Sequence, residues 1–479
     1  MIVATNSLGT TGRPGCEGHS VASLNPYTGK VVGMSPFSHW DEVEMAANSS
    51  MNSFREWAMV PATTRLAVLY QCSRAITGQR ETLARLLADE VGKPITVARA
   101  EVDRTVLTLR LASNLERVGE PERIPLDYDP RGGEYVCRYW RVPRGPVLGI
   151  VPYNWPLNLA AHKIAPALAA GNTVIIKPSP LGALSTFLLV SILNECGLPP
   201  GVLTCVLCSN EDTERLARDP RVAMVSFTGS ERVGWHLKSI LPEKPVTLEL
   251  GGDASCLVFD DADLEAAAKR IALGAYVYAG QVCIAAQRAL FVGGRTDSYE
   301  RFKECLAEAT RTTPTGNPLD EATVCGPVIN ADAADRIMSW IAEAESQGAK
   351  VLAGGNRIGN LIEPTLLEDV PPTCSLATEE VFGPVLTLSS IESEKDAISM
   401  VNASRFGIHC SAFTHDKDRV ARCFNELDVG GLVVNDFPNL RFDSMPYGGN
   451  KRSGFGREGV RFAFEEMTTT RVLLERIET

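Results

Sequence analysis

The chain has 479 residues, and its 47 Lys and Arg residues against 58 Asp and Glu residues give a formal net charge of −11, which argues against a nucleic-acid partner. With 44% hydrophobic residues the composition is that of a globular protein, and the length exceeds what one core usually supports, so we expect two large domains. No segment approaches the ~18 consecutive apolar residues of a membrane span, and residues 1–18 lack the pattern of a targeting peptide, so we expect no membrane partner and a cytoplasmic location.

Helices come first along the chain. Thr63 is suited to cap a segment in which leucines recur at helical spacing as far as Gly92, and a second amphipathic helix is expected over about 97–118. After them, short apolar runs alternate with helical patterns, which predicts a doubly wound, mostly parallel α/β sheet. The expected strands of this sheet are residues 146–151, 173–177, 202–207, 223–227 and 246–250.

The same alternation resumes beyond Gly252 and predicts a second α/β domain. Its expected helices are residues 263–279, 299–309 and 331–347. Its expected strands include residues 289–292, 385–388, 409–414 and 432–435.

Two segments fit neither α/β domain. Residues 134–142 alternate as an exposed strand or hairpin does, through Tyr135, Cys137, Tyr139 and Arg141. The residues after Met467 are rich in Thr, Val and Leu and predict a strand with no partner nearby in the sequence. Because soluble proteins avoid unpaired strand edges, both segments are candidates for pairing across subunits.

The thirteen cysteines give no indication of disulfides or of a metal site. They stand singly except for Cys205 and Cys208, which lie in an apolar run that predicts a buried strand. The six histidines never occur at the spacing of a helical zinc site. We therefore expect no metal, and so many thiols favour a reducing cytoplasm.

Cys283 and Glu249 stand in contexts that favour catalysis. Cys283 follows an apolar helix in a turn that contains Gly280, where a side chain can face a cleft. Glu249 ends an apolar strand, and Gly251 and Gly252 after it permit close backbone approach. A carboxylate at the carboxyl end of a strand and a thiol in the following α/β unit suit covalent catalysis by a cysteine with a nearby base.

Seven short strings carry a resemblance to the aldehyde dehydrogenase superfamily. They are VPYNWPL (151–157), IIKPS (175–179), FTGS (227–230), ELGG (249–252), GQVC (280–283), EEVFGP (379–384) and PYGG (446–449). Each string alone is weak, but their common order and spacing are specific. The resemblance covers about residues 20–479.

The resemblance implies an α/β fold of three parts. A doubly wound, Rossmann-like domain over residues 1–125 and 144–251 would bind NAD or NADP, and a second α/β domain over residues 252–445 would be catalytic. A small β arm over residues 126–143 and 460–479 would join subunits into a homodimer or homotetramer. The implied reaction is oxidation of an aldehyde to the carboxylic acid through a cysteine thiohemiacetal and a thioester that water hydrolyses.

Catalytic roles carried over from the family fall on four residues. Cys283 would attack the aldehyde carbon as a thiolate. The Asn154 side-chain amide and the Cys283 backbone N–H would stabilise the oxyanion. Glu249 would act as general base, and Lys163 matches a lysine that supports this machinery.

The implied cofactor site does not use the G-x-G-x-x-G fingerprint. Thr228, Gly229 and Ser230 would open a helix whose free N–H groups suit a pyrophosphate. Lys177 would bind the adenosine ribose, Glu380 the nicotinamide ribose, and Phe382 would pack by the ring. The other expected cofactor contacts are Pro152, Trp155 and Ser179.

Two features leave the choice between NAD and NADP open. Many NAD-preferring relatives have a glutamate three residues after the lysine of the strand end, where this chain has Pro180, so a 2′-phosphate would not be repelled. The loop expected at residues 209–214 lacks the glycines common there and carries three acidic residues, which would oppose a phosphate.

The expected substrate is a small polar or aliphatic aldehyde. Residues 280–284 and 441–446 resemble the lactaldehyde and semialdehyde dehydrogenases of the family. Relatives that bind phosphorylated aldehydes often place an arginine just before the nucleophile, where this chain has Val282. The candidate substrate contacts are Arg104, Trp155, His162 and Phe455.

Two alternatives remain at this point. A coenzyme A-acylating dehydrogenase is one, but such relatives usually lack the base of the ELGG string, so Glu249 favours water. A catalytically inactive structural relative is the other. Intact Cys283, Glu249, Asn154 and Glu380 argue against it.

Overall fold

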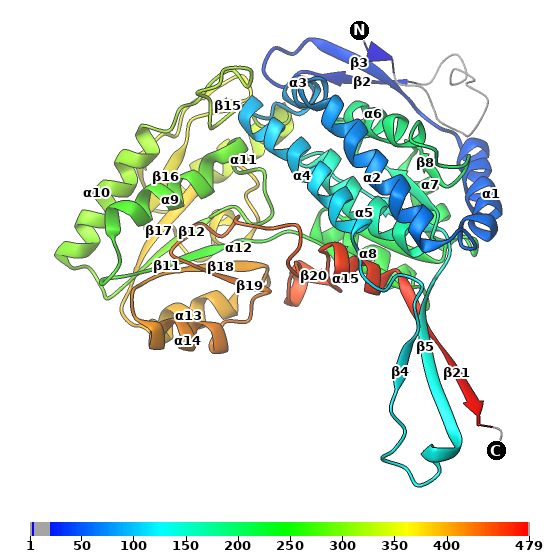
Figure 1. The fold of residues 1–479 in the computed structure, drawn as a ribbon. Coiled ribbons are helices and arrows are strands. Elements are labelled where there is room, and N and C mark those ends of the chain that lie inside the picture. Colours follow the sequence, from blue (N-terminus) through cyan, green and yellow to red (C-terminus); the bar gives the residue numbers. More distant parts are fainter. Residues whose placement is uncertain (1, 4–19, 478–479) are drawn as a thin grey trace.

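The computed structural model describes residues 2–3 and 20–477 (Figure 1). Most of the segment inspected for a targeting signal, and the last two residues, therefore lie outside the described part. Figure 1 shows two α/β units side by side and a slender β arm that extends away from the first unit. Within the described residues, no helix is both long enough and apolar enough to cross a membrane.

A six-stranded sheet forms the centre of the first unit, in the order β20-β10-β9-β6-β7-β8. Five of its strands are parallel neighbours, β6 (Val147–Ile150), β7 (Val174–Lys177), β8 (Leu203–Cys205), β9 (Met224–Thr228) and β10 (Val246–Glu249). These are the strands expected from the sequence, so that prediction is confirmed. The sixth, β20 (Gly454–Phe455), comes from far along the chain and pairs antiparallel with β10.

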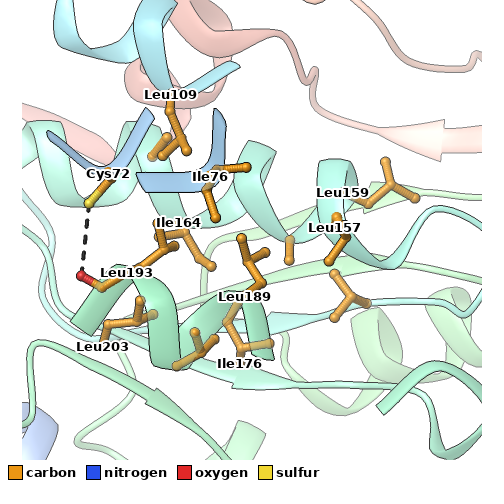
Figure 2. Packing of buried hydrophobic residues seen from close by; sticks show 14 of the residues in the cluster. Cys72, Ile76, Leu109, Leu157, Leu159, Ile164, Ile176, Leu189, Leu193 and Leu203 are labelled. Carbon is orange, nitrogen blue, oxygen red and sulfur yellow. Dashed lines mark hydrogen bonds between the residues drawn. The ribbon is translucent and has the colours of Figure 1, made fainter. Parts of the chain in front are cut away.

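Eight helices cover this sheet. They are α1 (Trp40–Trp57), α2 (Ala62–Gly78), α3 (Arg80–Val91), α4 (Ile95–Ser113), α5 (Pro156–Ala170), α6 (Ala183–Asn194), α7 (Asn210–Arg218) and α8 (Glu231–Ile240). Figure 2 shows how α2, α4, α5 and α6 pack their aliphatic side chains together over β7 and β8. Burial of this apolar surface is the main stabilising contribution to the unit.

Helix α5 is central to the site, and all fifteen of its residues are buried. Its first turn is held by Glu101 of α4, whose Oε1 accepts hydrogen bonds from the backbone N–H groups of Leu157 and Asn158, at 2.9 and 3.2 Å. A carboxylate at this position satisfies N–H groups that a helix leaves free and complements the helix dipole. Asn154 lies just before the start of this helix.

Two predictions in this unit are wrong. The single helix expected from Thr63 to Gly92 is two helices, α2 and α3, because Gln79 leaves helical geometry between them (φ −107°, ψ 14°). The loop expected at residues 209–214 is the start of α7, where the Ser209 side chain accepts a hydrogen bond from the Asp212 N–H at 2.9 Å. Acidic residues favour this position because they complement the positive end of a helix.

The second unit has a seven-stranded sheet in the order β13-β16-β17-β12-β11-β18-β19. Its strands are β11 (Ser255–Phe259), β12 (Arg288–Val292), β13 (Lys350–Ala353), β16 (Thr365–Glu368), β17 (Val385–Ile391), β18 (His409–Phe413) and β19 (Gly431–Val434). Its helices are α9 (Leu264–Tyr276), α10 (Asp297–Arg311), α11 (Ala331–Ser346), α12 (Ser375–Thr378), α13 (Glu394–Ala403) and α14 (Lys417–Glu426). Smaller sheets are formed by β1 (Ile2–Val3), β2 (Ser20–Leu24) and β3 (Val31–Pro36), and by β14 (Arg357–Ile358) and β15 (Leu361–Ile362).

The arm is a three-stranded antiparallel sheet of β21 (Thr468–Arg476), β5 (Tyr135–Pro143) and β4 (Glu122–Ile124). The two segments expected to present unpaired edges therefore pair with each other, from Thr468 opposite Pro143 to Arg476 opposite Tyr135. Residues 460–466, which we assigned to the arm, instead form α15 (Val460–Glu466), which packs on α5 and α4. Strand β21 still lies at an edge of the arm, so one of its sides is open (Figure 1).

Candidate active site

A cavity of about 970 Å³ is lined by side chains from both α/β units. Among the sequence-predicted site residues, it is lined by Arg104, Pro152, Asn154, Trp155, Lys177, Ser179, Thr228, Gly229, Ser230, Glu249, Cys283, Glu380 and Phe382. A volume of this size suits a ligand as large as a dinucleotide with a small substrate beside it. Three other predicted residues, Lys163, His162 and Phe455, do not line it.

Cys283 is presented by a sharply turned segment after α9. Tyr278 and Ala279 have positive φ angles of 54° and 53°, which non-glycine residues rarely adopt. Gly280 follows with φ 66°, and a Cβ there would collide with the carbonyl oxygen of Gly383. Glycine is therefore required at position 280, and the turn directs Cys283 into the cavity.

Asn154 is bound to this same turn. Its side-chain nitrogen donates a hydrogen bond to the backbone carbonyl of Gln281 at 2.9 Å, and its oxygen accepts one from the Trp155 N–H at 3.1 Å. An amide nitrogen has two hydrogens, so the second is available to a ligand in the cavity. This arrangement brings an amide donor to the wall that carries the Cys283 thiol.

Glu249 ends β10 on the cavity wall and is only 2% exposed. Neither of its carboxylate oxygens has a hydrogen-bond partner within the described residues. Burial raises the pKa of Glu249 well above its ordinary range, and the nearby Glu458 carboxylate raises it further. An unpartnered carboxyl group whose pKa is raised is suited to exchange protons at a higher pH than an ordinary carboxylate does.

Behind the cavity, Lys163 joins the catalytic and cofactor sides. Its Nζ donates to Glu458 Oε1 and Thr228 Oγ1, both at 2.8 Å, and to Ser226 Oγ at 3.2 Å. Burial opposes the charge of Glu458, but Lys163 and Arg441 lower its pKa to about 2. Glu458 is a site residue that the sequence analysis missed, since no string around it stood out.

The residues expected from the sequence to bind a cofactor lie around a helix start and an acidic side chain on the cavity wall. Helix α8 begins directly after Ser230 with no side chain capping its first N–H groups, which leaves them to bind an anion. On the opposite wall, Glu380 Oε1 accepts a hydrogen bond from the Gly252 N–H at 3.2 Å. A Cβ at Gly251 would collide with the Glu380 carboxylate, so the glycines make room for this acid.

Lys177, Ser179 and Pro180, which the sequence analysis expected near an adenosine ribose, all line the cavity. Burial lowers the pKa of Lys177. Of the acidic residues at the start of α7, only Glu214 lines the cavity, and its carboxylate contacts His236 Nε2 at 3.0 Å. Fewer acidic side chains therefore line this part of the cavity than the sequence indicated.

A sequence profile of the aldehyde dehydrogenase family matches residues 14–473. The chain belongs to the aldehyde dehydrogenase family. It is 36% identical to the 3-sulfolactaldehyde dehydrogenase of Priestia aryabhattai over 452 aligned residues, and this alignment covers 94% of each chain.

Solved structures agree with this assignment. Aldehyde dehydrogenase 21 of Physcomitrella patens, in complex with the reaction product succinate, matches with a TM-score of 0.95 and 36% identity over 99% of this chain and 98% of that chain. The NADP-dependent glyceraldehyde-3-phosphate dehydrogenase of Bacillus halodurans, complexed with NADP, matches with a TM-score of 0.95 and 32% identity over 100% of both chains. The chain is therefore an NAD(P)-dependent dehydrogenase that oxidises an aldehyde to the carboxylic acid.

A charged cluster lies where the sequence analysis of this aldehyde dehydrogenase expected substrate contacts. Arg104 donates to both oxygens of Asp443, at 3.0 and 2.7 Å, while one face of its guanidinium lies 5.3 Å from the Trp155 ring. His162 Nε2 contacts Asp443 Oδ1 at 2.9 Å. Burial opposes ionisation of Asp443, but the hydrogen bonds from His162 and Arg104 lower its pKa.

Two of the predicted substrate contacts are wrong. His162 is fully buried behind the cavity wall, because its ring is directed to Asp443 rather than toward the cavity. Phe455 lies in β20 with 46% of its surface exposed, and its ring packs under the ammonium group of Lys238 at 3.5 Å. Arg441 and Tyr447 line the cavity instead, and the Tyr447 hydroxyl oxygen lies 3.0 Å from the Cys283 sulfur.

Proposed function

We propose that this enzyme oxidises a small aldehyde that carries a carboxylate or sulfonate group, with Arg441 as the residue that binds the anion. Arg441 lines the cavity, its side chain is only 6% exposed, and its Nε has no hydrogen-bond partner within the described residues. A buried N–H donor without an acceptor is unfavourable, so a substrate anion would supply the acceptor that the Arg441 Nε lacks.

The neighbours of Arg441 leave its Nε–H without an acceptor in the described part of the chain. Its guanidinium forms an ion pair at 3.5 Å with Glu458 Oε2, while Lys163 binds the other carboxylate oxygen, Oε1. His162 Nε2 lies 3.4 Å away, but that nitrogen must carry its hydrogen to bind the Asp443 carboxylate and so cannot accept another. Arginine binds carboxylate and sulfonate groups well because its donors are planar and paired.

The relatives support this choice of substrate class. One is named for an aldehyde with a sulfonate, and a solved structure holds the dicarboxylate succinate as product. Phosphorylated aldehydes fit less well, since the residue before the nucleophile is the apolar Val282. The 3-sulfolactaldehyde and succinate-type substrates share one feature, an anionic group a few bonds from the aldehyde carbon.

In the reaction we propose, the Cys283 thiolate attacks the aldehyde carbon, and the free hydrogen of Asn154 Nδ2 stabilises the oxyanion. The bound nicotinamide cofactor would accept the hydride. Glu249 takes a proton from the water that hydrolyses the thioester, while Lys163 holds Glu458 and Thr228 in position. Thr228, Gly229, Ser230, Lys177 and Glu380, with Pro152, Trp155, Ser179 and Phe382 around them, would hold the cofactor.

A matched pair of substrates tests the anion proposal. Succinate semialdehyde and its methyl ester differ mainly in the charge that Arg441 would bind. We expect kcat/KM for the free acid to exceed that for the ester by about tenfold to a hundredfold, the range of a hydrogen bond to a charged group. Arg441→Gln should remove the difference, whereas Arg80→Gln, an exposed arginine outside the cavity, should keep it. Equal use of the two substrates by the wild type would contradict the proposal.

We also propose that the enzyme works as a homodimer or homotetramer in the cytoplasm. Among the described strands β21 pairs only with β5, so it is an edge strand, and its Val472, Leu473 and Leu474 side chains are exposed. Such an edge favours pairing with a neighbour. The described cysteines are all free thiols, which fits a reducing compartment.

A further inference from the structure

Tyr447 lies against the nucleophile in a way that the family assignment does not explain. Its hydroxyl oxygen is 3.0 Å from the Cys283 sulfur, and within the described residues this is the one hydrogen-bond contact of either atom. The ring is buried, with only 3% of the residue exposed. A buried hydroxyl group normally donates to some acceptor, and here the sulfur is the acceptor within reach.

The ring of Tyr447 is held so that this contact persists. The Tyr447 backbone N–H donates to the Glu458 carbonyl at 3.0 Å, and the Glu458 N–H donates back at 2.7 Å. The Arg441 guanidinium lies over the ring at 3.7 Å from its centroid, and the edge of the His409 ring packs at 5.4 Å. Contacts on the backbone and on the ring therefore fix the direction of the hydroxyl group.

We propose that Tyr447 is a further catalytic residue, whose hydroxyl donates a hydrogen bond to the Cys283 sulfur and thereby stabilises the reactive thiolate. A thiolate has no proton to give, so the phenol must be the donor, and an S–H group is in any case the weaker donor of the two. No proton leaves Tyr447. When the sulfur bonds to the aldehyde carbon its negative charge passes to the oxygen, and the hydrogen bond weakens accordingly.

The surroundings of Cys283 make such a donor necessary. Burial raises the pKa of the Cys283 thiol to about 12, and the carboxylates of Glu380 and Glu249 raise it, whereas Tyr447 and Arg441 lower it. Only the thiolate is a good nucleophile. Arg441 also lies against the Tyr447 ring, and its positive charge makes the phenol a stronger donor. This inference concerns the family reaction and holds whichever aldehyde is the substrate.

The test is the pH dependence of Cys283 alkylation in Tyr447→Phe. Iodoacetamide inactivates the enzyme at a rate that follows the thiolate fraction, with mass spectrometry identifying the modified cysteine. We expect Tyr447→Phe to move the midpoint upward by about one to two pH units, the effect of one hydrogen bond to a charged group. Below both midpoints the rate should fall about tenfold to a hundredfold. The acid side of the kcat/KM profile should move in the same direction.

Tyr276→Phe is the matched control. Its hydroxyl is buried in the second unit, outside the cavity, against the Thr310 hydroxyl and the Thr365 carbonyl, so its removal costs two hydrogen-bond contacts without touching the nucleophile. We expect this variant to keep the wild-type midpoint. If the Tyr447→Phe and wild-type profiles coincide, the proposal is wrong.

A second variant keeps the test decisive if Tyr447→Phe fails to fold. Site-specific 3-fluorotyrosine at position 447 keeps the ring and its contacts but makes the phenol a stronger acid and a stronger donor. The alkylation midpoint should then move to lower pH, opposite to the phenylalanine variant. An unchanged or higher midpoint would overturn the proposal.

Discussion

In the proposed mechanism Cys283 carries out the first chemical step, because the hydride can leave only after the thiol has bonded to the aldehyde carbon. We therefore expect Cys283→Ala to lower turnover to below about a hundredth of wild type while cofactor binding is kept, since cofactor contacts lie elsewhere on the cavity wall. Cofactor binding is measured by the quenching of intrinsic fluorescence. Turnover above that level would show that another residue is the nucleophile.

Turnover should depend on pH through the protonation state of Glu249. Because burial raises its pKa, Glu249 keeps its proton above the ordinary carboxylate range and becomes a base only as the pH rises through that raised pKa. Turnover limited by thioester hydrolysis should therefore increase with pH, and Glu249→Gln should remove this increase. The free energy of unfolding should change in the opposite direction to turnover. The folded state binds the Glu249 proton more tightly than the unfolded state, so the contribution of Glu249 to stability is lost as the pH rises. A pH profile of Glu249→Gln equal to that of the wild type would place the base elsewhere.

Pro180 should influence the preference of the enzyme between NAD and NADP. No carboxylate stands at this position to repel a 2′-phosphate, so the preference between NAD and NADP should be modest. Pro180→Glu should shift the ratio of kcat/KM values toward NAD by about tenfold or more, or ~1.4 kcal/mol. A wild-type preference for NAD above about a thousandfold, or ~4 kcal/mol, would contradict this role.

The turn before the nucleophile is an element whose geometry can be tested by itself. Gly280→Ala would force a Cβ against the Gly383 carbonyl oxygen at a positive φ angle, so the turn and Cys283 must move. A displacement of about 1 Å at a reacting group can cost about a hundredfold in rate. Gly78→Ala, at the end of α2 with open space around it, is the control and should keep wild-type kcat. Equal kcat values in both variants would show that the turn does not position the thiol.

Strands and helices were predictable where the local pattern was strong. The parallel strands of the first sheet are bounded by glycines and charged residues, and each was expected from the sequence alone. Strand β11 was missed because its short apolar run follows the ELGG string without a separating helix. Phe455 was misplaced because an aromatic residue near a glycine gives no indication of which side of the sheet it will occupy.

The cavity itself depends on the whole molecule. Arg441, Tyr447 and Glu458 come from the last part of the chain, yet they meet Glu249 and Cys283 across the two units. Motif spacing was enough to select Cys283 and Glu249 as the proposed nucleophile and base, because both belong to short strings. It could not show that the Arg441 Nε lacks a hydrogen-bond partner within the described residues or that Tyr447 reaches the sulfur, since both facts depend on tertiary packing.

The β arm leads us to expect that two copies of the chain associate. Deleting the residues after Met467 removes β21 and leaves the long edge of β5 exposed, while both α/β units keep their sheets. We expect the truncated protein to fold but to lose dimer formation, as measured by light scattering at micromolar concentration. A mass near 51.8 kDa, one chain, for the intact protein would show that the arm does not join subunits.

Mass spectrometry of Glu249→Gln tests most directly whether an anionic aldehyde is oxidised while bound to Cys283 and then released with the help of Glu249. The variant is mixed with succinate semialdehyde and NADP or NAD. Without the base, hydrolysis of the thioester should stall. We predict that most of the protein gains the mass of one succinyl group, and that peptide mapping places it on Cys283. Absence of the adduct while reduced cofactor forms in one rapid turnover, or its presence on another residue, would contradict the mechanism.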